Sequence, residues 1–283
     1  MSTNPLRFIL NFQEFQNTHL NSAGKVSNNR MNSMGEHFEL YIKNLFCGYT
    51  ENPEKEIIKN YPDFFSWNGA KNSPPDLIIK SGDAIEIKKI EGIKPDIALN
   101  SSNPKNKLYS NSTLITEECK NCEQESWIEK DILYIIGSVN KDTEELYKLW
   151  MVYGDCYCAN NSTYENIKKI IKSGVETLPD LTFSESNELG RLNKIDPLGI
   201  TNLRIRGMWT IQHPANVFKY LEKTDSFDVN FLVLEEKYKT FSQLDINKIE
   251  INKEVLVSSV EIKDPNNPAK LLKAKLIQLC LKK

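Results

Sequence analysis

Two carboxylates and an amine lie close together in one short stretch of the sequence, SPPDLIIKSGDAIEIKKIE, residues 73–91. Asp76 stands at the start of one apolar run, and Glu86 and Lys88 stand inside the next. Mg²⁺ takes carboxylate oxygens from proteins, together with waters and phosphate oxygens. Beside such an ion, an ammonium group can orient an attacking water, accept its proton or balance charge at phosphorus. These residue types therefore predict metal-assisted hydrolysis of a phosphodiester.

The three side chains converge only if the stretch folds as a β-hairpin. Residues 77–80 and 84–90 read as strands, and the Ser-Gly-Asp between them is typical of a turn. With a three-residue loop at 81–83, Asp76 pairs with Lys88. Because side chains two apart in a strand share a face, the three polar groups then point to one side. A two-residue loop would move the register by one and turn the aspartate to the other face.

The same residues also have a purely structural interpretation. Acids and lysines are common in this chain, so an Asp, Glu and Lys at such spacing also arise by chance. Glu86 and Lys88 would then form an ion pair that serves only the fold. The context favours a site, because Pro75 precedes the aspartate and an unpaired charge within an apolar strand is costly.

Composition excludes several classes of protein. The 283 residues are 40% hydrophobic, which suits a globular protein with one large core. The 36 basic and 38 acidic residues leave a formal charge of -2, so any surface that attracts nucleic acid must be local. We expect a cytoplasmic protein with no membrane span or signal peptide. The six cysteines are expected to be reduced thiols, and structural zinc at the pairs Cys119/Cys122 and Cys156/Cys158 is the weaker alternative.

The order of elements predicts the fold class. A short apolar N-terminal helix and a polar stretch at 17–33 precede a helix that starts at a capping box, Ser33 and Glu36, and runs to Phe46. Five later segments read as strands, at 131–139, 146–158, 199–211, 230–238 and 254–262. A helix between the second and third of them is expected to end before Gly174. This pattern predicts a single α/β domain over 1–283, with a mixed central sheet flanked by helices and with insertions.

The Pro-Asp pair at 75–76 and the Glu-Ile-Lys triplet at 86–88 resemble the core motif of PD-(D/E)XK nucleases. Longer blocks are more specific: NSPPDLIIKSGDAIEIKKIE, ALNSSNPKNKLYS, LWMVYGDCYCA, GVETLP and ELGRLNKIDPLGITNLRIRGMW. Together, over roughly residues 30–220, they are similar to the NgoPII family of type II restriction endonucleases. The resemblance implies a catalytic core at about 30–160 and elements for DNA recognition and packing at about 161–283.

The family resemblance also implies roles for the motif residues. Asp76 and Glu86 would bind Mg²⁺, and Lys88 would position the water that attacks the scissile phosphate. In nucleases of this core, a glutamate on the helix before the sheet often joins the metal site. Glu39 is therefore a candidate third ligand, and Glu36 a weaker one, because the capping box already accounts for it.

The partners follow from the class. The resemblance implies double-stranded DNA as the substrate, and the family's namesake is associated with the site GGCC. A palindromic site read by two copies of the chain implies a homodimer with twofold symmetry. A cognate DNA methyltransferase would protect the host's own sites.

Arginine usage points to a DNA-reading segment. The chain has only five arginines, and three of them, Arg191, Arg204 and Arg206, fall within sixteen residues. The planar guanidinium binds guanine or phosphate through two hydrogen bonds, which lysine does not. We therefore expect these three to contact DNA, although an edge strand with solvated arginines would look similar.

A second candidate for DNA contact follows the Glu86 strand. Asn100, Ser101 and Ser102 are short hydrogen-bonding groups, and Lys105 and Lys107 are cations. Such a mixture suits phosphate and sugar contacts, but a plain turn would have much the same composition.

Two other functions fit parts of this pattern. A nuclease of repair or recombination type would cut by DNA structure and yield no discrete fragments from a plasmid. A DNA-binding protein without activity would use the charged strand only for its fold. In that case Lys88→Ala would change nothing except stability.

Overall fold

A nine-stranded mixed sheet forms the centre of the molecule. The structure is a computed structural model that describes residues 3–280 except 16–19, 21–29, 50–59, 71–72, 93–94, 144, 178–181, 184–188, 194 and 222–227. The strand order is β1-β2-β3-β6-β7-β12-β14-β13, and β5 also pairs with β6. The bounds are β1 Phe65–Trp67, β2 Leu77–Ile79, β3 Ala84–Glu91, β5 Lys107–Tyr109, β6 Glu129–Val139, β7 Leu146–Tyr153, β12 Val229–Leu234, β13 Val255–Asp264 and β14 Asn267–Leu279.

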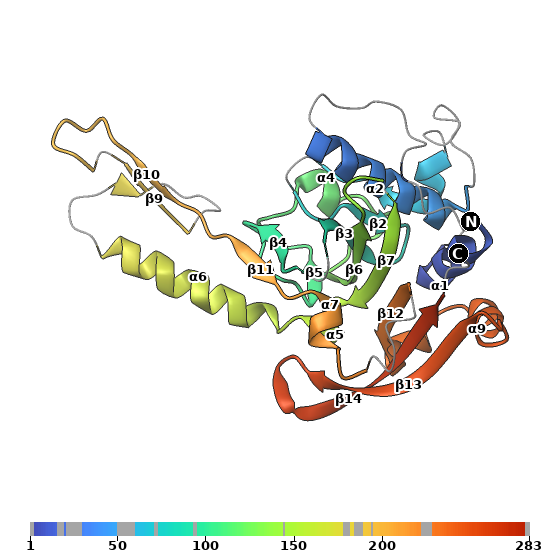
Figure 1. Ribbon diagram of the computed structural model, residues 1–283. Coiled ribbons are helices and arrows are strands. Elements are labelled where there is room, and N and C mark those ends of the chain that lie inside the picture. The colour runs from blue at the N-terminus through green and yellow to red at the C-terminus, as the bar shows by residue number, and fades with distance from the viewer. Residues whose placement is uncertain are drawn as a thin grey trace.

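Both faces of the central strands are covered, which explains their almost continuous apolar sequence. Strand β3 runs parallel to β6, and β7 runs parallel to β12. Every residue from 132 to 139 of β6 is buried, as is typical of strands with elements packed on both faces. Helices α1 (Pro5–Phe15) and α2 (Arg30–Cys47) lie against each other on one side of this sheet (Figure 1).

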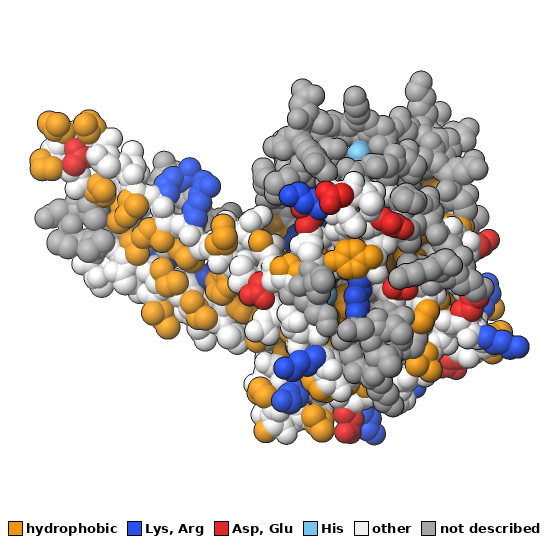
Figure 2. Space-filling view, in the orientation of Figure 1, with side chains coloured by type: hydrophobic (Ala, Val, Ile, Leu, Met, Phe, Trp, Pro, Cys, Tyr) orange, Lys and Arg blue, Asp and Glu red, His pale blue; other side chains and the backbone are white. Residues whose placement is uncertain are grey.

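An arm projects from this body (Figure 1). It consists of helix α6 (Asn161–Glu176) and a three-stranded sheet of order β10-β9-β8, with bounds β8 Thr182–Phe183, β9 Gly190–Asn193 and β10 Leu203–Ile205. A two-stranded sheet of β4 (Ile97–Asn100) and β11 (Trp209–Ile211) joins the arm to the body. Figure 2 shows hydrophobic side chains gathered over the arm, and the most exposed are Ile170, Leu198, Ile200 and Met208.

Short helices complete the fold. They are α4 (Glu117–Lys120), α5 (Gly154–Tyr157), α7 (Pro214–Val217), α8 (Glu235–Tyr238) and α9 (Gln243–Glu250). Of these, α5, α8 and α9 contact the C-terminal strands. The long hairpin of β13 and β14 closes the sheet at the edge next to α9. None of the described helices is long and apolar enough to cross a membrane.

The mixed sheet with flanking helices confirms the predicted fold class, but several boundaries differ. Helix α2 already begins at Arg30, so Ser33 lies within the helix and is not its N-cap. The strand predicted to reach residue 158 ends at Tyr153, where α5 begins. The strand predicted at 199–211 is broken between β10 and β11, and α6 continues through Gly174. Strand β14 was not predicted.

A contact between Phe38 and Gly137 sets the distance between α2 and the sheet. A Cβ atom at position 137 would clash with the Phe38 ring, which is fully buried. Gly137→Ala should therefore lower the free energy of unfolding by about 1–3 kcal/mol, the usual cost of overpacking. Urea denaturation measures this change.

Gly174→Ala is the matched control, because no heavy atom lies within 4 Å of a Cβ placed there. In the interior of α6, alanine should be favourable by roughly 0.5–1 kcal/mol. Unchanged stability in Gly137→Ala would contradict the tight helix-to-sheet packing.

Candidate active site

The hairpin forms with the predicted face but in a different register. Leu77 lies opposite Ile85, so the ladder places Asp76 opposite Glu86 and not, as predicted, opposite Lys88. The Ile79 N–H donates to the Asp83 carbonyl at 2.9 Å. The loop therefore still has three residues, but it lies at 80–82, one position earlier than predicted. The register moves by two, which preserves the face.

A cation bridge holds the three polar groups together. The Lys88 Nζ lies 2.7 Å from Glu86 Oε1 and 4.0 Å from Asp76 Oδ2. The same Asp76 oxygen accepts a hydrogen bond of 2.6 Å from the Ile87 N–H. Glu86 Oε2, in contrast, is buried and has no hydrogen-bond partner. The group is thus assembled without satisfying one of its carboxylate oxygens.

The pKa values of the three side chains are shifted in different ways by their surroundings. Burial, with the nearby charge of Glu86, raises the pKa of Asp76 to about 7. Burial opposes the charge of Glu86 as well, but Lys88 and Lys105 outweigh it and hold the pKa of Glu86 below its ordinary value. Burial would lower the pKa of Lys88, yet the two carboxylates raise it. Glu86 and Lys88 are therefore an ion pair, and Asp76 is the carboxyl that exchanges its proton near neutrality.

The three residues lie in a cleft of about 850 Å³. Asn100, Ser101 and Ser102, which follow β3 in the sequence, line the same cleft, and their contact with DNA stays a prediction. Arg206 also lines it, because Trp209 of β11 pairs with Asn100 of β4 and brings the end of the arm to the cleft. The ladder thus joins residues that are a hundred positions apart in the sequence.

Two other candidates for DNA contact, Arg204 and Lys107, do not line this cleft. Arg204 is exposed on β10 opposite Arg191 of β9, whose side chain lies outside the described residues. Lys107 is engaged with Glu129 at 2.7 Å and with Asp131 at 3.2 Å. The structure therefore places Arg204 and Lys107 outside the set of residues that line the cleft.

Lys105 is more deeply placed than a surface contact would require. It is buried, with its Nζ bonded to Ser102 Oγ and, at 3.2 Å, to the Asn103 carbonyl. Burial lowers its pKa, the Glu86 charge opposes this, and Lys168 adds to the lowering. Lys168 itself lines the cleft and donates to Asn103 Oδ1 at 2.6 Å. The sequence had not singled out Lys168; its spacing from Lys172 on one helix face was the available signal.

The two glutamates of α2 are placed differently. The charge of Glu39 acts on both Asp76 and Lys88, although Glu39 does not line the cleft. Glu36 is exposed. Within the part of the chain that the structure describes, no cluster of three or more His, Cys, Asp or Glu side chains is placed to hold a metal. The hairpin itself brings together two carboxylates, those of Asp76 and Glu86.

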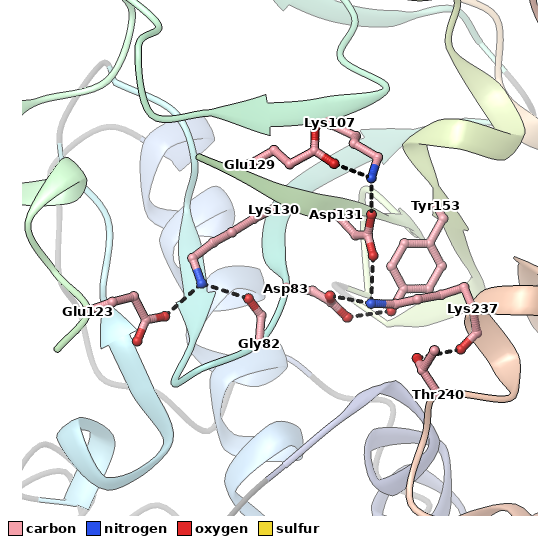
Figure 3. A network of polar contacts seen from close by, with 10 residues as sticks. All are labelled: Gly82, Asp83, Lys107, Glu123, Glu129, Lys130, Asp131, Tyr153, Lys237 and Thr240. Atoms are coloured by element: carbon pink, nitrogen blue, oxygen red, sulfur yellow. Dashed lines mark hydrogen bonds and ion pairs between the residues drawn. The ribbon is translucent and has the colours of Figure 1, made fainter. Parts of the chain in front are cut away.

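A network of ion pairs holds the start of β3 (Figure 3). Lys237 lies between Asp83 and Asp131, with its Nζ 2.7 Å from an oxygen of each. The Tyr153 hydroxyl donates to Asp83 at 2.6 Å. Because Asp83 is held in this way, it belongs to the strand ladder and not to the loop. This network accounts for the shifted hairpin register.

Asp155 lies beside this network without an ion-pair partner among the described residues, and we expect it to make the stability of the protein depend on pH. Burial, with the charge of Asp131, raises the pKa of Asp155 to about 6, and its Oδ1 has no hydrogen-bond partner. A folded-state pKa above the unfolded value means that the folded state holds a proton that the unfolded state has lost. The contribution to stability is therefore present below about pH 4 and lost as pH rises to about 6.

Asp155→Asn should remove this loss. At pH 7 the variant should be more stable than the wild type by up to about 3 kcal/mol, and the difference should vanish near pH 4. Urea denaturation at several pH values tests this, with the exposed Asp142→Asn as control. A variant that is no more stable at pH 7 would contradict the raised pKa of Asp155.

The mixed sheet and its flanking helices define a restriction-endonuclease-like fold. The family model for NgoPII restriction endonuclease matches residues 3–263. The chain is also 43% identical over 254 residues to the type II restriction enzyme NgoPII of Neisseria gonorrhoeae, which covers 89% of this chain and 90% of that protein. No solved structure matches the chain closely enough to count as similar.

The chain belongs to the NgoPII family of type II restriction endonucleases and is a site-specific deoxyribonuclease. This confirms the family and the activity expected from the sequence. The match also extends beyond the stretch 30–220 on which the resemblance was based. Helix α1 and most of β13 therefore belong to the family's common region.

Proposed function

We propose that Asp76 and Glu86 bind Mg²⁺ and that Lys88 positions the attacking water. One observation carries this proposal: two carboxylates and a lysine share one face of a hairpin in a cleft, and Glu86 Oε2 lacks any partner. Two carboxylates suit Mg²⁺, which keeps several waters and takes oxygens from a bound phosphate. When bound, the ion would polarise the scissile phosphate and make a water more acidic.

Each side chain of the site would then have a different role. Asp76 must be ionised to act as a ligand, so metal binding would be coupled to loss of its proton. Glu86 is already ionised and would present its unpartnered oxygen. Lys88, held 2.7 Å from Glu86, would keep its ammonium directed at the phosphate and hold the water in line with the bond that breaks. Glu39 would add negative charge behind Asp76 and stands as the candidate third ligand.

The residues around the cleft would contact two different parts of the DNA, the backbone and the base edges. Asn100, Ser101, Ser102 and Lys105 would hold the backbone, because short polar groups and cations suit phosphate and sugar oxygens. Arg206 at the cleft would reach base edges, with Arg191 and Arg204 on the adjoining hairpin of the arm. DNA recognition would thus fall to the elements after residue 161, and catalysis to those before it.

The same reasoning supports a homodimer that acts in the cytoplasm on a palindromic site. Each copy of the chain would supply one cleft with Asp76, Glu86 and Lys88, and cutting both strands of a twofold site calls for a second copy. The family resemblance makes GGCC the first site to test, and a methyltransferase of matching specificity would protect the host.

Plasmid cleavage tests the proposed function. Purified protein is incubated with plasmid and Mg²⁺ or EDTA, and fragment ends are sequenced. Discrete fragments only with Mg²⁺, all ending within one palindrome, are the expected result. Fragments without a common sequence would favour a structure-specific nuclease, and equal cleavage in EDTA would contradict a divalent ion as cofactor.

A further inference from the structure

A second hollow, of about 430 Å³, adjoins the catalytic cleft. The two share four lining residues, Thr113, Leu114, Lys168 and Leu189. One wall is the face of α6, and the other is the segment that runs from Asn103 to Leu114. The hollow is therefore a continuation of the cleft along the base of the arm, and we call it the lysine groove.

The groove is strongly basic in a chain that carries a net negative charge. It is lined by a single acid, Glu165, and by five lysines, namely Lys105, Lys107, Lys168, Lys169 and Lys172. Positions 165, 168, 169 and 172 are three or four apart, so they form one stripe of the helix. A chain without a net positive charge needs a local positive surface in order to bind a polyanion, and this one lies beside the cleft.

The lysines of the groove differ in what they already contact. Lys107 is paired with Glu129 and Asp131, and Lys168 is paired with Glu165 at 3.0 Å. Lys169 and Lys172 are exposed and form no ion pair with any described residue. These two ammonium groups are thus the ones that can take a new anionic partner without breaking an existing pair.

The groove has a fixed shape. Tyr164 of α6 packs edge-on against Trp209 of β11, with ring centroids 5.7 Å apart. Lys168 is bonded across the groove to Asn103 Oδ1. The opposite wall carries small polar groups at Asn111, Ser112 and Thr113, which suit hydrogen bonds to phosphate and sugar oxygens. A preformed channel can hold a nucleic-acid backbone in one register, whereas a flat charged surface would only attract it.

We propose that the lysine groove binds the sugar–phosphate backbone of the DNA beyond the scissile phosphate, with Lys169 and Lys172 as its free cationic contacts. The inference rests on the proposed function, because it assumes that the scissile phosphate sits at Asp76 and Glu86. Contacts to phosphates carry no sequence information, so the groove sets affinity and register and leaves the choice of site to other residues.

The test is the salt dependence of DNA binding by Lys169→Ala/Lys172→Ala, measured in EDTA so that no cleavage occurs. Fluorescence anisotropy is used with one duplex that contains the cognate site and one in which that site is scrambled. Each lost phosphate contact should lower the slope of log K against log salt by about 0.9. The double variant should therefore lose about 2 from the slope and at least about tenfold in affinity near 0.1 M salt, equally on both duplexes.

Lys248→Ala/Lys253→Ala is the matched control, because it removes the same charge from two exposed lysines in and just after α9. It should leave the slope unchanged. An unchanged slope in the groove variant, or an equal loss in the control, would overturn the inference. Failure of the proposed function is separately visible, because the wild type would then give no discrete Mg²⁺-dependent fragments whatever the groove variant does to binding.

Discussion

Lys88→Ala should abolish DNA cleavage and leave DNA binding largely intact. The lysine is the one cation within reach of both Asp76 and Glu86 among the described residues, and its Nζ is held by Glu86. If it positions the attacking water and balances charge at phosphorus, its loss should slow the chemical step by about 10²- to 10⁴-fold. Single-turnover cleavage of a short cognate duplex measures that step without product release.

The structure requires a stability control for this variant. Removal of Lys88 leaves the buried Glu86 without its ion-pair partner, and breaking such a pair can cost about 3–5 kcal/mol. Urea denaturation should therefore accompany the kinetics, at a temperature where the variant remains folded. Lys80→Ala, in the loop of the same hairpin and exposed, should cut DNA as the wild type does. A folded Lys88→Ala protein with the wild-type single-turnover rate would refute the catalytic role.

Asp76→Asn should abolish Mg²⁺ binding and, with it, cleavage. The substitution removes a charge but little volume, and an amide oxygen can still accept the hydrogen bond from the Ile87 N–H. Because the pKa of Asp76 is already about 7, the folded protein tolerates a neutral side chain here and should keep its stability. Loss of a ligand should weaken Mg²⁺ binding by more than about 100-fold, since loss of a group that only orients a ligand already costs 10- to 100-fold.

Isothermal titration of metal-free protein with Mg²⁺ checks this second prediction. The exposed Asp142→Asn carries the same change of charge on the turn between β6 and β7 and serves as control. Wild-type Mg²⁺ affinity in Asp76→Asn would show that the aspartate is not a ligand, even if the variant no longer cuts DNA.

The hairpin shows what local sequence can and cannot predict. Alternation of side chains placed Asp76, Glu86 and Lys88 on one face, and any even shift of register preserves that result. The register itself was wrong by two because Asp83 was assigned to the loop. Its place in the ladder is fixed by Tyr153 and Lys237, and Lys237 is 154 positions away. A contact of that separation has no local signature.

The cleft was predictable only in part, for the same reason. Asn100 to Ser102 follow β3 closely, so nearness in sequence was a usable guide. Arg206 and Lys168 reach the cleft through the β4 and β11 ladder and through α6, and neither pairing could be read from periodicity. Strand β14 was missed because its lysines interrupt the apolar pattern along an exposed part of the hairpin.

The family match supports the activity, and the geometry of the hairpin supports the roles of individual residues. Membership of the NgoPII family accounts for site-specific cleavage of DNA. The roles of individual residues rest on the geometry, above all on a buried glutamate with one oxygen engaged by Lys88 and the other without a partner. The salt dependence of binding tests the lysine groove independently of these roles.

A crystal structure of the protein with a cognate duplex and Ca²⁺ in place of Mg²⁺ tests the central claim most directly. We predict a cation bound by oxygens of Asp76 and Glu86 at about 2.3–2.6 Å, with an oxygen of the scissile phosphate as a further ligand. The Lys88 ammonium should lie beside the same phosphate. A scissile phosphate bound elsewhere, with Glu86 and Lys88 still paired only to each other and no cation between the carboxylates, would contradict the account and assign these charges to the fold.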